Sequence, residues 1–246
     1  MTRTTLFMKD LQPCFCPSYS NSKTGGKKDG MMSIGYMPGL DYLIFKNTGL
    51  LVTDCKGTCG GVNCAACQEK CYAISTVKQY KDACIKRIQN TMQLRSDINA
   101  HFDDIEKTII NDKIKIVRYT ESGELESLAQ LIHLLRLAQR HTDVFFYLYT
   151  KNYNVLREFF NIHTLPDNMV ILVSVWGSVG VNEWHEFKNY KNVKCFAVNS
   201  DLKTCAFCPA YKLNENGKAK LNKKMTCAKC RLCFDSKAKI IGCYEH

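Results

Sequence analysis

Nearly continuous apolar runs alternate with amphipathic segments through the middle of the chain. The runs, each typical of a strand buried on both faces, are 113–119 (KIKIVRY), 144–149 (VFFYLY), 169–176 (MVILVSVW) and 193–198 (VKCFAV). The segments with helical spacing that follow the first three runs are 124–139, 153–160 and 182–188. Buried strands joined by helices predict an α/β fold with a parallel sheet.

Right-handed crossovers either curl such a sheet into a barrel or leave it open and doubly wound, and we expect a partial barrel. In both cases the carboxyl ends of the strands carry the site. Ahead of this core, a helical pattern starts at Cys67, and a second helix follows a cap at Ser96 or Asp97. The runs 42–45 and 49–53 are short and β-like.

The pattern divides the chain into three parts. Residues 1–54 form an irregular segment with the first short strands, and residues 55–200 form the β/α core with a cysteine-rich loop. Residues 201–246 form an extension rich in cysteine and lysine, with a basic turn or hairpin at 212–224. A segment this short and polar is expected to need a metal for its structure.

Composition points to an intracellular metalloprotein. No apolar run reaches the ~18 residues that span a bilayer, and the N-terminus has no apolar signal-peptide core. We therefore expect a cytoplasmic protein with no membrane partner. In a reducing compartment, 15 cysteines indicate metal or redox chemistry. The alternative is an extracellular disulfide protein, which the odd number of cysteines disfavours.

The formal net charge of +11 leaves two interpretations open. Part of this charge would balance cysteine thiolates, because each ligating thiol loses its proton. The remainder favours nucleic acid as a partner. The simpler interpretation is a solvated surface, since net charge alone specifies no partner.

The first cysteine group has the spacing Cys59-x4-Cys64-x2-Cys67-x3-Cys71. Four thiolates in one loop are enough for a [4Fe–4S] cluster. Alternatively, only three of them bind the cluster. That arrangement leaves one iron open to substrate or water, as a catalytic cluster requires.

The second cysteine group admits two metals. Cys205-x2-Cys208 followed by Cys227-x2-Cys230 has the spacing of a zinc ribbon. Cys227-x2-Cys230-x2-Cys233 is instead a compact ferredoxin-like triple, and Cys208 completes a set of four. Iron–sulfur is favoured by the triple, with zinc as the alternative. Cys84 is interpreted as a small buried residue, and the cysteines left without a role are Cys14, Cys16, Cys55, Cys195 and Cys243.

Polar residues follow the predicted core strands. Arg118, Glu121 and Glu124 end or follow the first strand, and Lys151 follows the second. Since β/α folds place their sites at these strand ends, the four are candidate catalytic residues. The alternative is that Ser122 and Glu124 only cap the next helix.

An ordered set of short motifs gives the chain a family resemblance. The motifs are SNSKTG (20–25), the cysteine loop ending in CYA (71–73), RYTESGE (118–124), YTK (149–151), LPDN (165–168), SVW (174–176), CPA (208–210) and the final cysteine triple. In this order they resemble the bacteriophage gene product 88 family of iron–sulfur proteins, over nearly the whole chain. That family is similar to radical-SAM enzymes.

The resemblance implies specific site residues. Cys59, Cys67 and Cys71 match the first cluster site of the family. The residues that match the second are Cys208, Cys227, Cys230 and Cys233. Residues 122–124 (Ser122, Gly123, Glu124) take the position that holds the amino group of S-adenosylmethionine in radical-SAM enzymes. The cysteine spacing departs from the Cys-x3-Cys-x2-Cys of those enzymes.

Taken together, the sequence predicts a phage-encoded metalloprotein of the host cytoplasm with two or more [4Fe–4S] clusters. Three functions stay open. The protein is an enzyme acting on a small molecule through a cluster at the mouth of a partial barrel, by redox or Lewis-acid chemistry. Alternatively, the metal sites are purely structural, or the protein is a nucleic-acid-binding module.

Overall fold

A single seven-stranded parallel sheet forms the centre of the molecule. The computed structural model describes residues 11–19, 25–39, 44–45, 50–51, 55–61, 67, 71–222 and 224–244. In order across the sheet, the strands are β1 (Met31–Ser33), β4 (Ile116–Tyr119), β5 (Phe145–Thr150), β6 (Met169–Trp176), β7 (Val193–Val198), β11 (Ile240–Cys243) and β8 (Ala206–Phe207). Every pair of neighbours is parallel, which confirms the predicted sheet.

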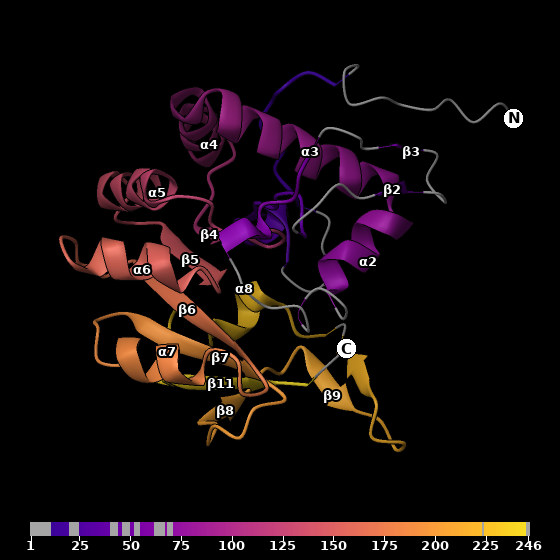
Figure 1. Ribbon diagram of the computed structural model, residues 1–246, viewed down its shortest axis with the longest axis vertical. Coiled ribbons are helices and arrows are strands. Elements are labelled where there is room, and N and C mark those ends of the chain that lie inside the picture. Colours follow the sequence, from indigo (N-terminus) through magenta and orange to yellow (C-terminus); the bar gives the residue numbers. More distant parts are fainter. Residues whose placement is uncertain are drawn as a thin grey trace, which may run out of the picture.

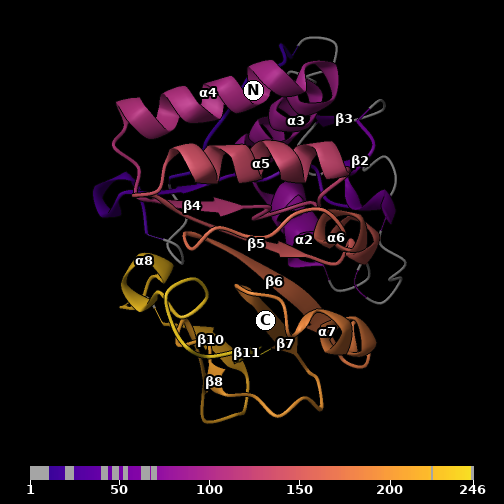
Figure 2. The same cartoon turned by 90° about the vertical axis from the view of Figure 1, so that its left-hand side faces the viewer.

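Helices cover one face of this sheet. They are α4 (Ile98–Asn111), α5 (Leu128–Arg140), α6 (Tyr153–Phe160) and α7 (Val181–Phe187). Figure 1 shows these helices stacked along one side of the strands, and Figure 2 shows the strands fanning from β4 to β8. Polar side chains start the first three: Asp97, Ser127 and Asn152 each accept a hydrogen bond from a backbone N–H in the first turn.

The pleat of the strands separates two apolar layers. In β5, Phe146 and Leu148 join the large core beneath the helices. Tyr147 points to the other face of the sheet, because neighbouring residues of a strand alternate between faces. There the C-terminal segment covers the strands, with Phe234 stacked on Tyr147 at 4.9 Å between ring centroids. Both faces of the sheet are therefore buried, as its apolar strands predict.

Several short elements differ from the sequence prediction. Strand β1 lies in the part expected to be irregular, and β8 and β11 come from the predicted extension yet join the main sheet. The first helical pattern is split into α2 (Tyr72–Gln79) and α3 (Lys81–Ser96), because Tyr80 has an extended backbone. Helix α5 begins at Leu128 rather than at residue 124, because Ser127 is its cap.

Smaller elements complete the described chain. β2 (Ile44–Phe45) and β3 (Leu50–Leu51) form an antiparallel pair before the first cysteine loop. β9 (Tyr211–Leu213) and β10 (Ala219–Leu221) form the predicted basic hairpin, and α8 (Cys227–Cys230) follows it. Among the described residues, no helix has both the length and the apolar character that crossing a bilayer requires.

Candidate functional site

A cavity lies at the carboxyl ends of the strands, between the sheet and both cysteine-rich segments. The space open to the centres of water-sized molecules amounts to about 190 Å³. Cysteines from both sequence groups line it: Cys59, Cys67, Cys71, Cys208, Cys227, Cys230 and Cys233. Thiols from the two ends of the sequence therefore face one chamber.

Cys59 is fixed by the loop that follows β1. It begins the 3-10 helix η3 (Cys59–Gly61), and its backbone N–H donates to the Gly39 carbonyl at 3.0 Å. In return, the Gly39 N–H donates to the Cys59 sulfur at 3.4 Å. Burial raises the pKa of Cys59 to about 12, and the nearby Glu124 carboxylate acts in the same direction. A metal bound by this thiol would have to displace its proton.

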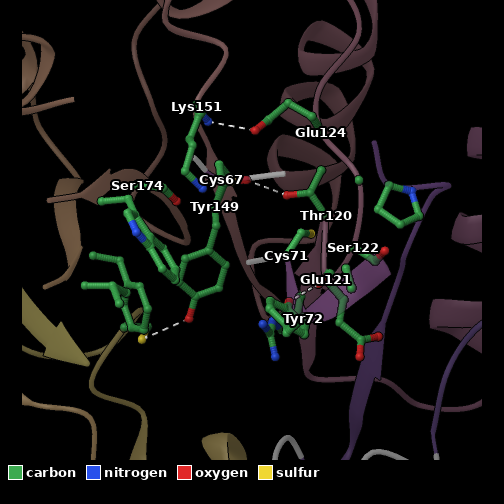
Figure 3. Close-up of a pocket in the computed structure, with 18 of the residues that line it drawn as sticks. Cys67, Cys71, Tyr72, Thr120, Glu121, Ser122, Glu124, Tyr149, Lys151 and Ser174 are labelled. Atoms are coloured by element: carbon green, nitrogen blue, oxygen red, sulfur yellow. Dashed lines mark hydrogen bonds between the residues drawn. The ribbon is translucent and has the colours of Figure 1, made fainter. Parts of the chain in front are cut away.

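Cys67 and Cys71 both line the cavity (Figure 3). Cys71 immediately precedes α2, whose first residue, Tyr72, donates its hydroxyl proton to the backbone carbonyl of Glu121 at 2.5 Å. This hydrogen bond connects the cysteine loop to the strand end after β4. Cys64, the fourth predicted ligand of this group, lies outside the described residues.

The C-terminal thiols lie against the face of the sheet opposite the helices. Cys208 follows β8, Cys227 and Cys230 begin and end α8, and Cys233 lies in the next turn. The Tyr149 hydroxyl, from β5, donates to the Cys233 sulfur at 3.1 Å. Burial raises the pKa of Cys233 to about 12, and the hydrogen bond from Tyr149 opposes this shift.

The structure does not bring every cysteine to the cavity. Cys205 is exposed and does not line it, although the zinc-ribbon spacing includes this residue. Cys84 is fully buried, as its apolar setting predicted. The sulfurs of Cys14 and Cys16 lie 3.5 Å apart near the start of the described chain, against α3 rather than at the cavity.

Arg118 is a buried cation on the cavity wall. It is 7% exposed, its guanidinium lies 5.1 Å from the centroid of the Tyr149 ring, and its Nε finds no hydrogen-bond partner among the described residues. The partner of Arg118 in the β4–β5 register is Tyr147, whose hydroxyl is buried beside Cys227. A buried cation is costly unless nearby groups compensate its charge. The positive charge of Arg118 acts on the thiols of Cys227 and Cys233, and it lowers the pKa of Cys233 against the larger effect of burial.

Hydrogen bonds connect the turn after β4 to Tyr36, in the loop after β1, and to Thr58, in the first cysteine loop. The Ser122 hydroxyl donates to the Tyr36 carbonyl at 2.9 Å, and the Glu124 N–H donates to Thr58 Oγ1 at 2.7 Å. Gly123 between them has φ +75°, a left-handed conformation that favours glycine. The alternative prediction, in which Ser122 and Glu124 cap the next helix, is therefore wrong, since Ser127 caps α5.

Glu124 joins the ends of two strands. Its carboxylate accepts hydrogen bonds from Thr150 Oγ1 at 2.5 Å, the Lys151 N–H at 2.8 Å and the Leu125 N–H at 2.9 Å. Burial raises its pKa, and these donors oppose the shift. Figure 3 shows Glu124 and Lys151 together at one end of the view and Glu121 at the other. All three line the cavity, but the two carboxylates do not form a pair.

Sequence reasoning missed the aromatic wall of the cavity. Tyr72, Tyr149, Trp176 and Phe196 line it, and the Tyr149 and Phe196 ring centroids are 5.1 Å apart. The alternation in β5 and β6 contained a signal, because the aromatic residues fall on the face opposite the helices. Only the observed register shows that this face opens into the cavity.

The donor set of the cavity is rich in sulfur. Thiolates of an iron–sulfur cluster bind separate irons at the corners of a cage. Seven thiols on one chamber, beside the buried cation Arg118, fit anionic thiolate clusters.

Comparison with known proteins gives one match. A family model described as Gene product 88 matches residues 17–236. No curated protein and no solved structure matches the chain significantly. The matched residues include the whole β/α core and all seven cysteines of the cavity.

Proposed function

The chain belongs to the gene product 88 family, and on that premise we propose that it is an iron–sulfur protein with two clusters in one cavity. Cys59, Cys67 and Cys71 hold the first, with Cys64 as a further thiol in the same loop. The ligands of the second are Cys208, Cys227, Cys230 and Cys233. The observation that carries the proposal is the lining of a single cavity by thiols from both groups.

Two observations favour iron–sulfur over zinc at the second site. The zinc-ribbon set needs Cys205, which is exposed and outside the cavity lining, whereas Cys233 lines it. A cluster with four thiolates is also an anion, and Arg118 is the buried cation beside it. A structural zinc site, which the spacing of Cys205, Cys208, Cys227 and Cys230 suggests, is the second candidate.

We propose further that the first cluster is catalytic and that the β/α core is a partial barrel. Successive strands β4, β5, β6 and β7 are added at the same side of the sheet, with their helices on one face. This is the winding of a barrel rather than of a doubly wound sheet. Three thiolates leave one iron open, and such a cluster supplies redox or Lewis-acid chemistry.

The residues of the chain would position a small substrate beside that iron. Glu124 is fixed by three donors, and both Glu124 and Lys151 line the cavity. S-adenosylmethionine is the first ligand to test, because residues 122–124 occupy the turn after β4. We place this activity in the reducing cytoplasm of the host cell, where thiols stay available for metal.

Anaerobic purification followed by iron, sulfide and EPR analysis tests the proposal. We expect about eight irons and eight sulfides per chain, the content of two [4Fe–4S] clusters. Cys59→Ser and Cys233→Ser should each remove about half of the iron. Cys84→Ser is the matched control, because Cys84 is buried but does not line the cavity.

The outcomes separate the candidates. Zinc in place of iron, lost on Cys205→Ser, would show the structural zinc site instead. Two intact clusters with no spectral change on addition of S-adenosylmethionine would reject that ligand but keep the clusters. A colourless, iron-free protein would reject the proposal entirely.

A further inference from the structure

The positive charge of the chain is concentrated near its C-terminal end. Residues 201–246 contain 10 Lys and Arg against 4 Asp and Glu, whereas residues 1–200 contain 24 against 19. Less than a fifth of the chain therefore carries more than half of the net charge. Exposed lysines in and after the β9–β10 hairpin account for much of this excess: Lys212, Lys218, Lys220 and Lys224.

The register of the hairpin places like charges side by side. Lys212 of β9 lies directly opposite Lys220 of β10, so both side chains project from the same face. Like charges directly opposite each other destabilise an antiparallel pair. A two-stranded ribbon has little stability to lose. An anionic partner would relieve this repulsion.

Some exposed cations elsewhere on the surface form ion pairs. In the helical layer, some exposed cations pair with acidic side chains, as in Lys107–Asp104, Arg157–Glu186 and Lys191–Asp167. In the described part of the hairpin segment, Lys212, Lys218, Lys220 and Lys224 form no ion pair. The hairpin therefore presents a row of lysines with no acidic partner among the described residues.

The hairpin is also joined to the rim of the cavity. Ala210, just before β9, lines the cavity, and so does Thr226, which follows β10. Asn222 closes the base of the hairpin by donating its N–H to the Ala210 carbonyl at 2.8 Å and its side-chain amide to the Pro209 carbonyl at 3.1 Å. Figure 1 shows β9 projecting from the body of the molecule. A polymer bound to the hairpin would therefore lie beside the cavity.

We propose that the β9–β10 hairpin binds the phosphate backbone of nucleic acid. Regularly spaced phosphates match a row of lysines, which act as point charges without a demand on ligand geometry. A narrow two-stranded ribbon also fits the major groove of a duplex. This proposal does not depend on the clusters, and it brings a nucleic acid next to the chamber.

Fluorescence anisotropy of the full-length, anaerobically purified protein tests this surface. The probes are labelled duplex DNA, single-stranded DNA and RNA of one sequence, each measured over a salt series. If the four lysines each contact a phosphate, the logarithm of the affinity falls with the logarithm of the salt concentration with a slope of about −4. Lys212→Glu/Lys220→Glu should reduce affinity at least about tenfold and reduce that slope by about two.

The control is Lys107→Glu/Lys188→Glu, which changes the net charge equally on the exposed helical side. It should bind nearly as well as the unmodified protein. Lys212→Gln/Lys220→Gln, which introduces no new repulsion, should weaken binding in the same direction. Absence of salt-dependent binding, equal losses in both charge-reversed proteins, or preference for anionic lipid vesicles would overturn the proposal. Preference among the three probes identifies the form of nucleic acid.

Discussion

His101 shows at the residue scale how a buried polar group organises the helical side of the core. It is fully buried on α4, with Nε2 2.9 Å from Tyr36 Oη and Nδ1 2.9 Å from Gln93 Oε1. The Tyr36 hydroxyl in turn lies 2.6 Å from Tyr119 Oη of β4, within hydrogen-bond distance. The imidazole therefore connects two helices with the strand that leads to the cavity.

This histidine should make stability depend on pH. Burial lowers the pKa of His101 to about 4, so the unfolded chain takes up a proton near pH 6.5 that the folded protein resists. Its contribution is complete above about pH 6.5 and is lost as the pH falls towards 4. Between pH 7 and 4.5, we expect the free energy of unfolding, measured with urea, to fall by about 2 to 3 kcal/mol from this residue alone.

The variant His101→Gln should lose this dependence, because glutamine does not titrate. Any loss of stability at pH 7 that comes from altered contacts leaves this slope unchanged. His185→Gln, at an exposed position, should keep the slope of the unmodified protein. Identical slopes in all three proteins would contradict the assignment.

The cysteine groups were predictable at this scale, and their neighbours were not. Thiol spacing alone identified both groups, and seven of the nine predicted ligands line the cavity. Arg118 was predicted from its position at a strand end. Its burial beside the Tyr149 ring and the orientation of Tyr149 towards Cys233 depend on strand register, which no local spacing reports.

At the scale of elements, the length of a strand decided whether the sequence could predict it. β6 and β7 begin and end where their apolar runs do, because six to eight buried residues give a clear pattern. β1, β8 and β11 have only two to four residues each and were missed. Such short strands owe their existence to neighbours in the sheet rather than to their own pattern.

The turn between β4 and α5 should tolerate no side chain at Gly123. A Cβ there would collide with Thr58 Oγ1 and lie 2.9 Å from the Tyr36 Cβ, in addition to the left-handed φ of +75°. We expect Gly123→Ala to reduce the free energy of unfolding by about 3 kcal/mol or more, through backbone strain plus steric conflict. Urea denaturation at neutral pH measures this loss.

Gly217 provides the matched control in the β9–β10 hairpin. Its φ is +70°, but an added Cβ would meet nothing within 4 Å. Gly217→Ala should therefore reduce the free energy of unfolding by about 1 kcal/mol, the cost of a left-handed backbone alone. Equal losses at the two glycines would mean that the contacts around Gly123 do not constrain the turn.

At the scale of the whole molecule, the C-terminal segment acts as the second cover of the sheet. Besides the ring stacking between Phe234 and Tyr147, Arg231 lies 5.0 Å from the centroid of the Phe145 ring, and Lys194 donates to the Ser236 carbonyl at 2.8 Å. The sequence predicted a metal-dependent extension. It did not reveal that this segment supplies two strands and part of the apolar layer on the face opposite the helices, because these contacts join residues far apart in the chain.

Removing the proposed second cluster should loosen this cover while leaving the helical side intact. α8 has only four residues, so the proposal implies that the segment 227–235 depends on bonds between its thiolates and the metal. After chelation, amide hydrogen exchange followed by mass spectrometry should show this segment exchanging at least about tenfold faster. The amides of β5 and β6 should change little. Unchanged exchange at 227–235 would indicate that apolar contacts alone hold the segment.

The position of β11 has a consequence for synthesis on the ribosome. β11 follows β8 in the chain but lies between β7 and β8, pairing with both. Until Ile240–Cys243 emerges, β7 presents bare backbone amides and carbonyls, and β8 has no strand to join. A nascent chain stopped before residue 240 would expose this unpaired strand edge to other polypeptides. We therefore expect aggregates to form when translation pauses late in the message.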